Sequence, residues 1–238
     1  MIILPAIDII EGKPVRLYQG DYDKKEEVAE SVEDTAKAFE KMGATYLHMV
    51  DLDGARLSKR VNHEVIVKVA KELSIPVEVG GGIRSMEDIQ YYLENGVSRV
   101  ILGTSAIEDE TFLKKAVKKY GNQIAVGIDC KDGWLCQSGW TETSRQYYVY
   151  FAQKMEEIGV QTLIVTDISK DGTLQGPNLN MLKTLQENVK CNLIASGGIK
   201  SIEHIQDLKA MNIYGAITGK ALYAHTLDLK EALKEVSE

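Results

Sequence analysis

Short runs of apolar, often β-branched residues alternate along the whole chain with longer amphipathic stretches. Continuous apolar runs of this length are typical of strands buried on both faces, as in a parallel sheet covered by helices. The runs predict strands at Ile2 to Ile7, Tyr46 to Val50, Pro76 to Val79, Arg99 to Leu102, Gln123 to Ile128, Thr162 to Thr166, Asn192 to Ala195 and Tyr214 to Thr218. The amphipathic stretches predict helices at Val32 to Met42, Glu64 to Leu73, Met86 to Asn95, Thr111 to Tyr120, Tyr148 to Ile158, Leu179 to Glu187 and Ile202 to Met211.

The pattern amounts to eight strand–helix units in 238 residues. Eight such units close a (β/α)₈ barrel, and about 250 residues is the usual size of that fold. Ser85 and Ser201 are predicted N-caps of two of the helices, because each serine directly precedes an amphipathic stretch. An open doubly wound sheet is the alternative, although it rarely contains eight units of such even length.

An internal repeat favours the barrel. The segment GGIRSMEDIQ at Gly81 to Gln90 matches GGIKSIEHIQ at Gly197 to Gln206, 116 residues further on. The same offset relates Gly103 to Gly219, and Gly43 to Gly159. The sequence therefore predicts an α/β fold, a TIM barrel built from two repeat-related half-barrels, at residues about 1–120 and 121–238. No linker-like segment divides the halves, so we expect one domain over residues 1–238.

Composition and charge narrow the class of protein. With 44% hydrophobic and 26% charged residues, the chain is neither fibrous nor disordered, and its net charge of −7 argues against nucleic acid or an anionic membrane as partner. Its three cysteines form no CxxC pair, which favours a reducing compartment. The apolar start MIILPAIDII lacks a basic leader, and no apolar run reaches about 18 residues. We expect a cytoplasmic, monomeric protein.

Four glycine-bearing segments follow predicted strands and precede helical stretches, where backbone N–H groups can hold a phosphate without any net basic charge. Because they form two repeat-related pairs, they predict two phosphate sites, and hence a small substrate with a phosphate at each end. Tight strand-to-helix turns are the alternative. The first pair contains Gly81, Gly82, Gly103 and Thr104, with Arg84 beside it, and the second contains Gly197, Gly198, Gly219 and Lys220.

Two aspartates also occupy repeat-related places. Asp8 is predicted to end the first strand and Asp129 the fifth, so that the two face each other across the barrel mouth, between the phosphate sites. A pair of acids in this arrangement suits general acid–base catalysis, although each could instead satisfy backbone amides in its turn. Asp51 and Asp167 form a second pair, for which we expect roles in orienting loops or substrate hydroxyls.

Three further side chains are candidates near the mouth. His48 lies inside a predicted strand and is either a hydrogen-bonded core residue or a substrate contact. Thr166 can hydrogen-bond an acid or a hydroxyl, and Trp140 follows Ser-Gly in a polar loop, where it either stacks on a planar ring or anchors the loop. The four histidines share no ligand spacing, so we expect no metal site.

Taken together, these motifs resemble the phosphoribosylformimino-aminoimidazole-carboxamide ribotide (ProFAR) isomerase family of histidine biosynthesis. The resemblance covers nearly the whole chain, in order. It rests on LPAID (Leu4 to Asp8), VRLYQGDY (Val15 to Tyr22), HMVDLDGA (His48 to Ala55), VGGGIRS (Val79 to Ser85), VGID (Val126 to Asp129), TDISKDGTLQGPN (Thr166 to Asn178), ASGGI (Ala195 to Ile199) and GKALY (Gly219 to Tyr223).

The resemblance implies a half-barrel-repeat enzyme that converts a bisphosphorylated aminoaldose into an aminoketose by an Amadori rearrangement, without cofactor or metal. It implies that Asp8 removes the C2′ proton as general base, and that Asp129 opens the ribose ring as general acid. It also implies that Thr166 supports Asp129 and that Trp140 stacks on the imidazole ring. Asp171 and Gly172, in the matched TDISKDGTLQGPN segment, are the remaining expected substrate-binding residues.

Three alternatives stay open. The cyclase subunit of imidazole glycerol phosphate synthase has a similar shape, but its first strand ends in CLD, and here Ala6 stands at the cysteine position. A bifunctional histidine and tryptophan isomerase is the second alternative. A non-catalytic barrel that binds a phosphorylated metabolite is the third, and the paired carboxylates argue against it.

Overall fold

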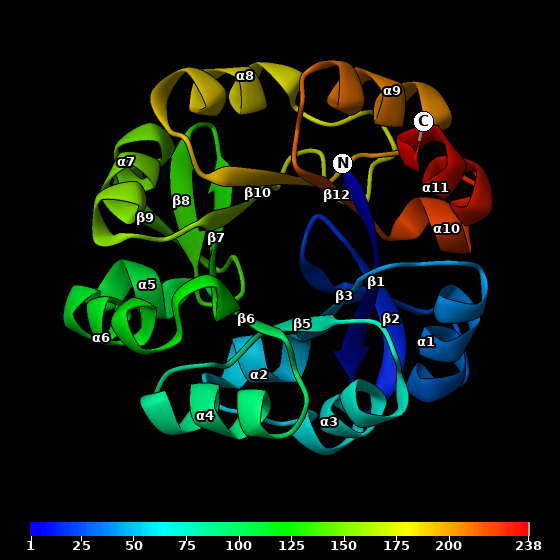
Figure 1. Cartoon of the computed structure of the whole chain (residues 1–238), viewed down its shortest axis with the longest axis horizontal. Coiled ribbons are helices and arrows are strands. Elements are labelled where there is room, and N and C mark those ends of the chain that lie inside the picture. Colours follow the sequence, from blue (N-terminus) through cyan, green and yellow to red (C-terminus); the bar gives the residue numbers. More distant parts are fainter. Residues whose placement is uncertain (238) are drawn as a thin grey trace.

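A closed barrel of eight parallel strands forms the centre of the protein. The structure is a computed structural model, and it describes residues 1–237. The barrel closes because β1 pairs with both β12 and β4, and each following strand pairs with the next around the ring (Figure 1). The strands are β1 (Ile2–Ile10), β4 (Leu47–Asp51), β5 (Val77–Gly80), β6 (Arg99–Leu102), β7 (Ile124–Lys131), β10 (Thr162–Asp167), β11 (Asn192–Ser196) and β12 (Gly215–Thr218). The predicted (β/α)₈ barrel is confirmed.

Helices surround the barrel as an outer ring (Figure 1). Seven of them have bounds within a few residues of those predicted from the amphipathic pattern, whereas the last helix of the chain and the short helices were not predicted. The longer helices are α1 (Val32–Lys41), α3 (His63–Glu72), α4 (Met86–Glu94), α6 (Glu110–Tyr120), α7 (Tyr148–Ile158), α8 (Leu179–Asn188), α9 (Ile202–Ala210) and α11 (Leu229–Ser237). Three shorter helices directly follow barrel strands, namely α2 (Leu52–Leu57), α5 (Thr104–Glu108) and α10 (Lys220–Tyr223), and a 3₁₀ turn, η1 (Gly121–Gln123), precedes β7.

The two predicted N-caps behave differently. Ser85 forms a capping box at the start of α4, in which its hydroxyl accepts from the Asp88 N–H and the Asp88 carboxylate accepts from the Ser85 N–H. Ser201 occupies the N-cap position of α9, but its side chain makes no capping hydrogen bond there. The prediction for Ser201 is therefore right in position and wrong in the bond, because position along the chain does not fix the orientation of a hydroxyl.

The apolar core has two main parts, beside a small cluster of Ile10, Val15 and Leu17. The larger one lies between the barrel and the helices, and includes the fully buried Ile3, Leu47 and Leu113. The smaller one fills the barrel interior with side chains from Leu4, Ala6, Ile101, Ala125, Ile164, Ile194 and Ile217. Filling of the interior is what this fold requires, and it leaves room for a site only at the carboxyl ends of the strands.

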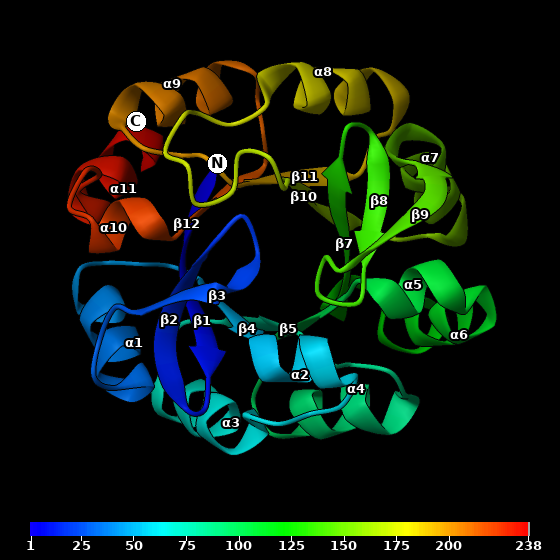
Figure 2. The same cartoon turned by 180° about the vertical axis from the view of Figure 1, so that it is seen from behind.

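Two hairpins extend from the barrel and were not predicted. One consists of β2 (Lys13–Tyr18) and β3 (Asp21–Glu27), the other of β8 (Trp134–Gln137) and β9 (Glu142–Tyr147), and they lie on opposite sides of the ring (Figure 2). The hairpins show that one prediction, which placed Asp8 and Asp129 at the ends of their strands, was wrong. Asp8 and Asp129 do not end their strands, because β1 and β7 each run two residues further to pair antiparallel with β2 and β8.

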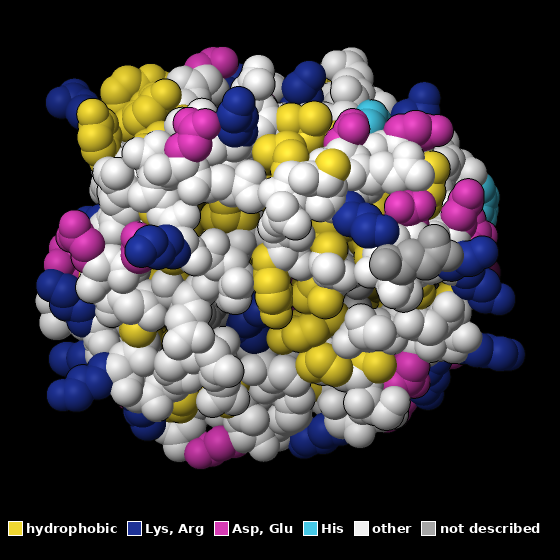
Figure 3. Space-filling view, turned by 45° about the horizontal axis from the view of Figure 1, so that its top comes forward, with side chains coloured by type: hydrophobic (Ala, Val, Ile, Leu, Met, Phe, Trp, Pro, Cys, Tyr) yellow, Lys and Arg dark blue, Asp and Glu magenta, His cyan; other side chains and the backbone are white. Residues whose placement is uncertain are grey.

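The surface carries both signs of charge. Figure 3 shows Lys and Arg side chains interspersed with Asp and Glu over the visible face. Among the helices of residues 1–237, none combines the length and the apolar character that crossing a bilayer requires.

Candidate active site

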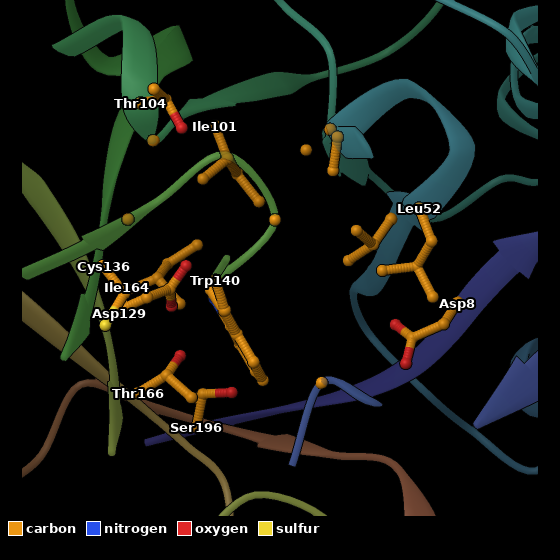
Figure 4. A pocket seen from close by; sticks show the side chains of 18 of the residues that line it. Asp8, Leu52, Ile101, Thr104, Asp129, Cys136, Trp140, Ile164, Thr166 and Ser196 are labelled. Carbon is orange, nitrogen blue, oxygen red and sulfur yellow. The ribbon is translucent and has the colours of Figure 1, made fainter. Parts of the chain in front are cut away.

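A cavity of about 200 Å³ opens at the carboxyl ends of the barrel strands. Its floor is apolar, with Ala6, Ile101 and Ile164 from the barrel interior, and its walls carry the predicted acids and the first pair of glycine segments. Asp8 and Asp129 project into it from β1 and β7 on opposite sides, with the Trp140 ring between them (Figure 4). The arrangement brings two carboxyl groups to one cavity from opposite halves of the repeat.

Asp129 projects into the cavity beside two hydrogen-bond donors. Thr166 is its direct neighbour in the parallel register of β7 and β10. Burial raises the pKa of Asp129 above its ordinary value, and hydrogen bonds from Trp140 and Thr166 oppose the rise without cancelling it. A carboxyl group in this setting holds its proton at a higher pH than an exposed one, which suits the donation of a proton.

Asp8 is held differently, in an ion pair with Arg16. The Arg16 Nη1 atom lies 2.6 Å from Asp8 Oδ2, and both side chains are mostly buried. Arg16 comes from β2, so the hairpin that follows β1 carries the cation back over the first acid. The two acids of the cavity thus differ in their partners, since one is paired with a cation and the other with neutral donors.

Asp171 is a third carboxyl group at the mouth, in the loop after β10, and it lines the main cavity beside Arg16. Burial raises the pKa of Asp171 to about 6, the charge of Arg16 opposes the rise, and the carboxylates of Asp8 and Asp129 add to it. Asp8, Asp129 and Asp171 therefore line one cavity, and Arg16 is the cation that acts on Asp8 and Asp171.

The first pair of glycine segments lines the main cavity. Gly81 and Gly82 have left-handed φ angles of 99° and 74°, and a side chain at either would overlap backbone oxygens of the loop after β4. Gly103 differs, because nothing lies within 4 Å of the place a Cβ would occupy. Packing thus explains Gly81 and Gly82, whereas the open side of Gly103 is free for a ligand.

Two polar side chains accompany this first pair. Thr104 Oγ1 accepts from the Ser138 N–H, which ties the β8–β9 hairpin to the start of α5. The Arg84 guanidinium contacts Glu108 and Ser58 at 3.3 and 3.1 Å, and Arg84 also lines the cavity. Both residues are therefore at the rim of the first predicted phosphate site.

The second pair of glycine segments lines a smaller cavity of about 30 Å³, formed by Gly197, Gly198, Gly219 and Lys220 together with Gly172. It is narrow because the Arg16 guanidinium occupies the space that a side chain at position 219 would need. Lys220 Nζ donates to the Gly172 carbonyl at 2.8 Å. The two predicted phosphate sites are related by the repeat but are unequal in shape.

Trp140 reaches the cavity from an unusual turn between β8 and β9. Ser138, Gly139 and Trp140 all have left-handed φ angles, of 55°, 65° and 71°. The turn of the other hairpin covers the indole, since a side chain at Gly20 would overlap its six-membered ring. The two hairpins, far apart in the sequence, thus meet above the acids.

His48 is a buried residue of β4 that lines the cavity. Its Nδ1 atom lies 2.6 Å from Oε1 of Glu78, which is fully buried and also contacts Arg99. The interpretation of His48 as a hydrogen-bonded core residue is confirmed, and a contact between His48 and substrate stays a prediction.

Asp51 and Asp167 hold loops rather than a ligand. The Asp51 carboxylate accepts from the backbone N–H groups of Gly54, Val61 and Asn62, and from the Asn62 side chain. Asp167 accepts from Ser169 and, at 2.7 Å, from the side chain of Asn178. Each asparagine lies eleven residues after its aspartate, so the repeat preserves the pair.

Sequence reasoning missed Arg16, Glu78 and Arg99. A glutamate within the apolar run VEVG was the available signal for Glu78, because a charge in a buried strand needs a partner. Arg16 had no such signal, since its place depends on a hairpin that the pattern did not reveal. Among residues 1–237, no three His, Cys, Asp or Glu side chains form a group that could hold a metal ion.

Comparison with known proteins identifies the family of this chain. Residues 2–228 match the family model described as "Histidine biosynthesis protein". The chain is 63% identical over 234 residues to a Clostridium beijerinckii protein named 1-(5-phosphoribosyl)-5-((5-phosphoribosylamino)methylideneamino)imidazole-4-carboxamide isomerase, with 98% of each chain covered. Proteins of the same name from Clostridium botulinum and Clostridium acetobutylicum are 58% and 52% identical, with 98% and 100% of each chain covered. This chain belongs to the histidine biosynthesis protein family.

Proposed function

We propose that the protein is an aldose–ketose isomerase that converts the bisphosphorylated aminoaldose ProFAR into its aminoketose in histidine biosynthesis. The observation that carries the proposal is the placement of Asp8 and Asp129 on opposite sides of one cavity, with the first pair of glycine segments in its wall and the second beside it. The names of the relatives support it, because they describe a molecule with two phosphoribosyl groups.

The two acids take different parts in this reaction. Asp129, whose pKa burial raises, donates its proton to the ring oxygen of the aminoaldose, so that the ribose ring opens. Asp8, a carboxylate in its ion pair with Arg16, removes the proton from C2′. Ring opening leaves a protonated Schiff base at C1′, and loss of the C2′ proton to Asp8 converts it into an enolamine. Asp8 then returns the proton at C1′, while the C2′ hydroxyl gives up its proton to Asp129, and the aminoketose is formed with both acids restored. The hydrogen bond from Thr166 keeps the Asp129 carboxyl group oriented.

The substrate spans the mouth with one phosphate at each glycine pair. Gly81, Gly82, Gly103 and Thr104 supply backbone N–H groups for one phosphate, with Arg84 at the rim. Gly197, Gly198, Gly219 and Lys220 serve the other, with Arg16 beside them. Trp140 covers the imidazole ring, and Asp171 and Gly172 border the sugar. Entry of the second phosphate requires the Arg16 guanidinium to shift from Gly219, since the cavity there is only about 30 Å³.

Turnover of ProFAR by the purified chain alone tests the proposal. An isomerase forms the aminoketose without a partner, whereas the cyclase alternative needs a glutaminase or ammonia and does not consume ProFAR. A non-catalytic barrel binds ProFAR without product. Absence of product from folded protein that binds ProFAR would overturn the isomerase assignment.

Growth complementation tests whether the protein also acts on the substrate of the tryptophan-pathway isomerase. We expect rescue of a strain that lacks the histidine isomerase and none of a strain that lacks the tryptophan isomerase. Rescue of both strains would instead assign the bifunctional activity. The monomeric state, the cytoplasmic location and the single domain stay predictions, which gel filtration, fractionation and limited proteolysis can test.

A further inference from the structure

A row of three buried polar side chains crosses the barrel interior next to the cavity. His48, Glu78 and Arg99 lie opposite one another in the register of β4, β5 and β6. Glu78 is fully buried, and the side chains of His48 and Arg99 are 9% and 7% exposed. Burial of such a cluster in an otherwise apolar interior costs free energy, which suggests that the cluster has a functional role.

Each oxygen of the Glu78 carboxylate has its own partner. Oε1 lies 2.6 Å from His48 Nδ1, while Oε2 accepts from Arg99 Nε at 2.8 Å and lies 2.6 Å from Arg99 Nη2. On the far side, the Arg99 guanidinium lies over the Tyr46 ring, 4.9 Å from its centroid. The guanidinium is thus held between a ring and one oxygen of the carboxylate, and the other oxygen is left to His48.

These contacts determine which nitrogen of His48 carries a proton. The Arg99 guanidinium, which is always charged, donates to Oε2 of the buried Glu78 and favours its carboxylate form. A carboxylate can only accept hydrogen bonds. The short contact to Nδ1 therefore requires a proton on Nδ1, and in the neutral ring it leaves the lone pair on Nε2.

We propose that Glu78, fixed by Arg99, is a positioning residue that holds His48 in its Nδ1–H tautomer, so that Nε2 accepts a hydrogen bond from a substrate hydroxyl. The assignment of the hydroxyl to the sugar of the aminoaldose rests on the proposed function, whereas the tautomer does not. The position of His48 supports this role, since it is a buried residue of β4 that lines the cavity.

The tautomer can be measured on the whole protein without substrate. Nitrogen-15 NMR of histidine-labelled protein at a pH where the rings are neutral distinguishes Nδ1–H from Nε2–H by the shifts of the two nitrogens. The chain has four histidines, and His48→Asn assigns the relevant pair of signals. We expect Nδ1–H for His48. A signal of the Nε2–H form would overturn the proposal, whatever the protein catalyses.

The variant Glu78→Gln should invert the tautomer. Arg99 offers only donors, so the amide oxygen must face Arg99, and the amide NH₂ then faces His48 Nδ1. Nδ1 becomes an acceptor and Nε2 carries the proton. We expect kcat for ProFAR to fall about 10- to 100-fold while KM stays within about twofold, the size usual for loss of an orienting partner. An unchanged tautomer with unchanged kcat would contradict the proposal.

A double variant separates positioning from folding. In Glu78→Gln with Arg99→Met, no donor fixes the amide, so its oxygen can turn to His48 and restore the Nδ1–H form. We expect the double variant to show the Nδ1–H form of His48 and a kcat at least tenfold higher than that of Glu78→Gln alone. If the double variant keeps both the Nε2–H form and the low kcat, the role of Arg99 is contradicted. The matched control is Glu110→Gln, at an exposed ion pair with Lys114, which should change neither quantity. If the wild type shows Nδ1–H but does not turn over ProFAR, the proposed function fails and the tautomer stands.

Discussion

The guanidinium of Arg16 forms an ion pair with the carboxylate of Asp8, at 2.6 Å. Through this contact the first hairpin places a cation beside Asp8 and Asp171, two of the three acids that line the cavity. The same guanidinium lies against Gly219. One side chain therefore connects the acid on β1 to the second predicted phosphate site.

Arg16→Gln should weaken both the ion pair with Asp8 and the contact with the second predicted phosphate site at Gly219. Removal of one partner from a mostly buried ion pair leaves a carboxylate without its cation, so we expect a loss of about 2–3 kcal/mol in the free energy of unfolding, measured in urea. We also expect kcat/KM for ProFAR to fall at least about tenfold. The control is Lys13→Gln, which removes an ion pair about half exposed at each end and should change the free energy of unfolding much less. Equal effects of the two variants would contradict the role given to Arg16.

The glycines at positions 81 and 103 should respond differently to alanine. Gly81→Ala places a Cβ on the Asp51 carbonyl at a left-handed φ, so we expect a destabilisation on the order of 2–4 kcal/mol. Gly103→Ala meets no neighbour, so its free energy of unfolding should stay within about 1 kcal/mol of wild type. Its KM for ProFAR should rise about tenfold, because the methyl group occupies the space for phosphate. A normal KM in folded Gly103→Ala would argue against phosphate at this turn.

Asp171 should make stability depend on pH. Its pKa is raised to about 6 in the folded protein, so its carboxylate form destabilises the fold, and stability is lost as pH rises through this value. Asp171→Asn removes this effect. We expect Asp171→Asn to have a higher free energy of unfolding than wild type. This difference should be about 1–2 kcal/mol larger at pH 8 than at pH 5. The exposed Asp23→Asn should show no such trend, and a flat difference for Asp171→Asn would refute the assigned burial effect.

Gly20→Ala should displace Trp140. A methyl group at position 20 overlaps the indole, whereas at Gly12, in the turn between β1 and β2, no atom lies within 4 Å. The two glycines have φ angles of 74° and 75°, so Gly12→Ala controls for backbone strain. In a Trp134→Phe background, which leaves Trp140 as the one tryptophan, we expect a red-shifted emission and a raised KM for Gly20→Ala only. Identical emission from both variants would show that the hairpin turn does not hold the ring.

The barrel was predictable because its strands are buried on both faces and its halves repeat. Continuous apolar runs marked each strand, and the offset of 116 residues paired Gly81 with Gly197. The hairpins escaped prediction for a physical reason. The strand β3, DYDKKEE, is almost entirely polar and mostly exposed, so it has no buried face to create a pattern and owes its form to pairing with β2.

The site was predictable only in part. The places of Asp8 and Asp129 follow from the repeat and the barrel, whereas their partners do not. Arg16 reaches Asp8 only because β2 folds back on β1, and Trp140 reaches the cavity through three consecutive left-handed residues. The strand–helix pattern fixes which strand ends meet, but the loops decide what surrounds the acids.

The reaction assigned to the two acids is the central claim, and kinetics of Asp8→Asn and Asp129→Asn test it most directly. Both substitutions keep the shape of the side chain and remove its ability to exchange a proton. With ProFAR as sole substrate, we expect each variant to lose about 10²- to 10⁴-fold in kcat while it binds ProFAR and melts cooperatively as the wild type does. Turnover within a few-fold of wild type in both variants would contradict the account.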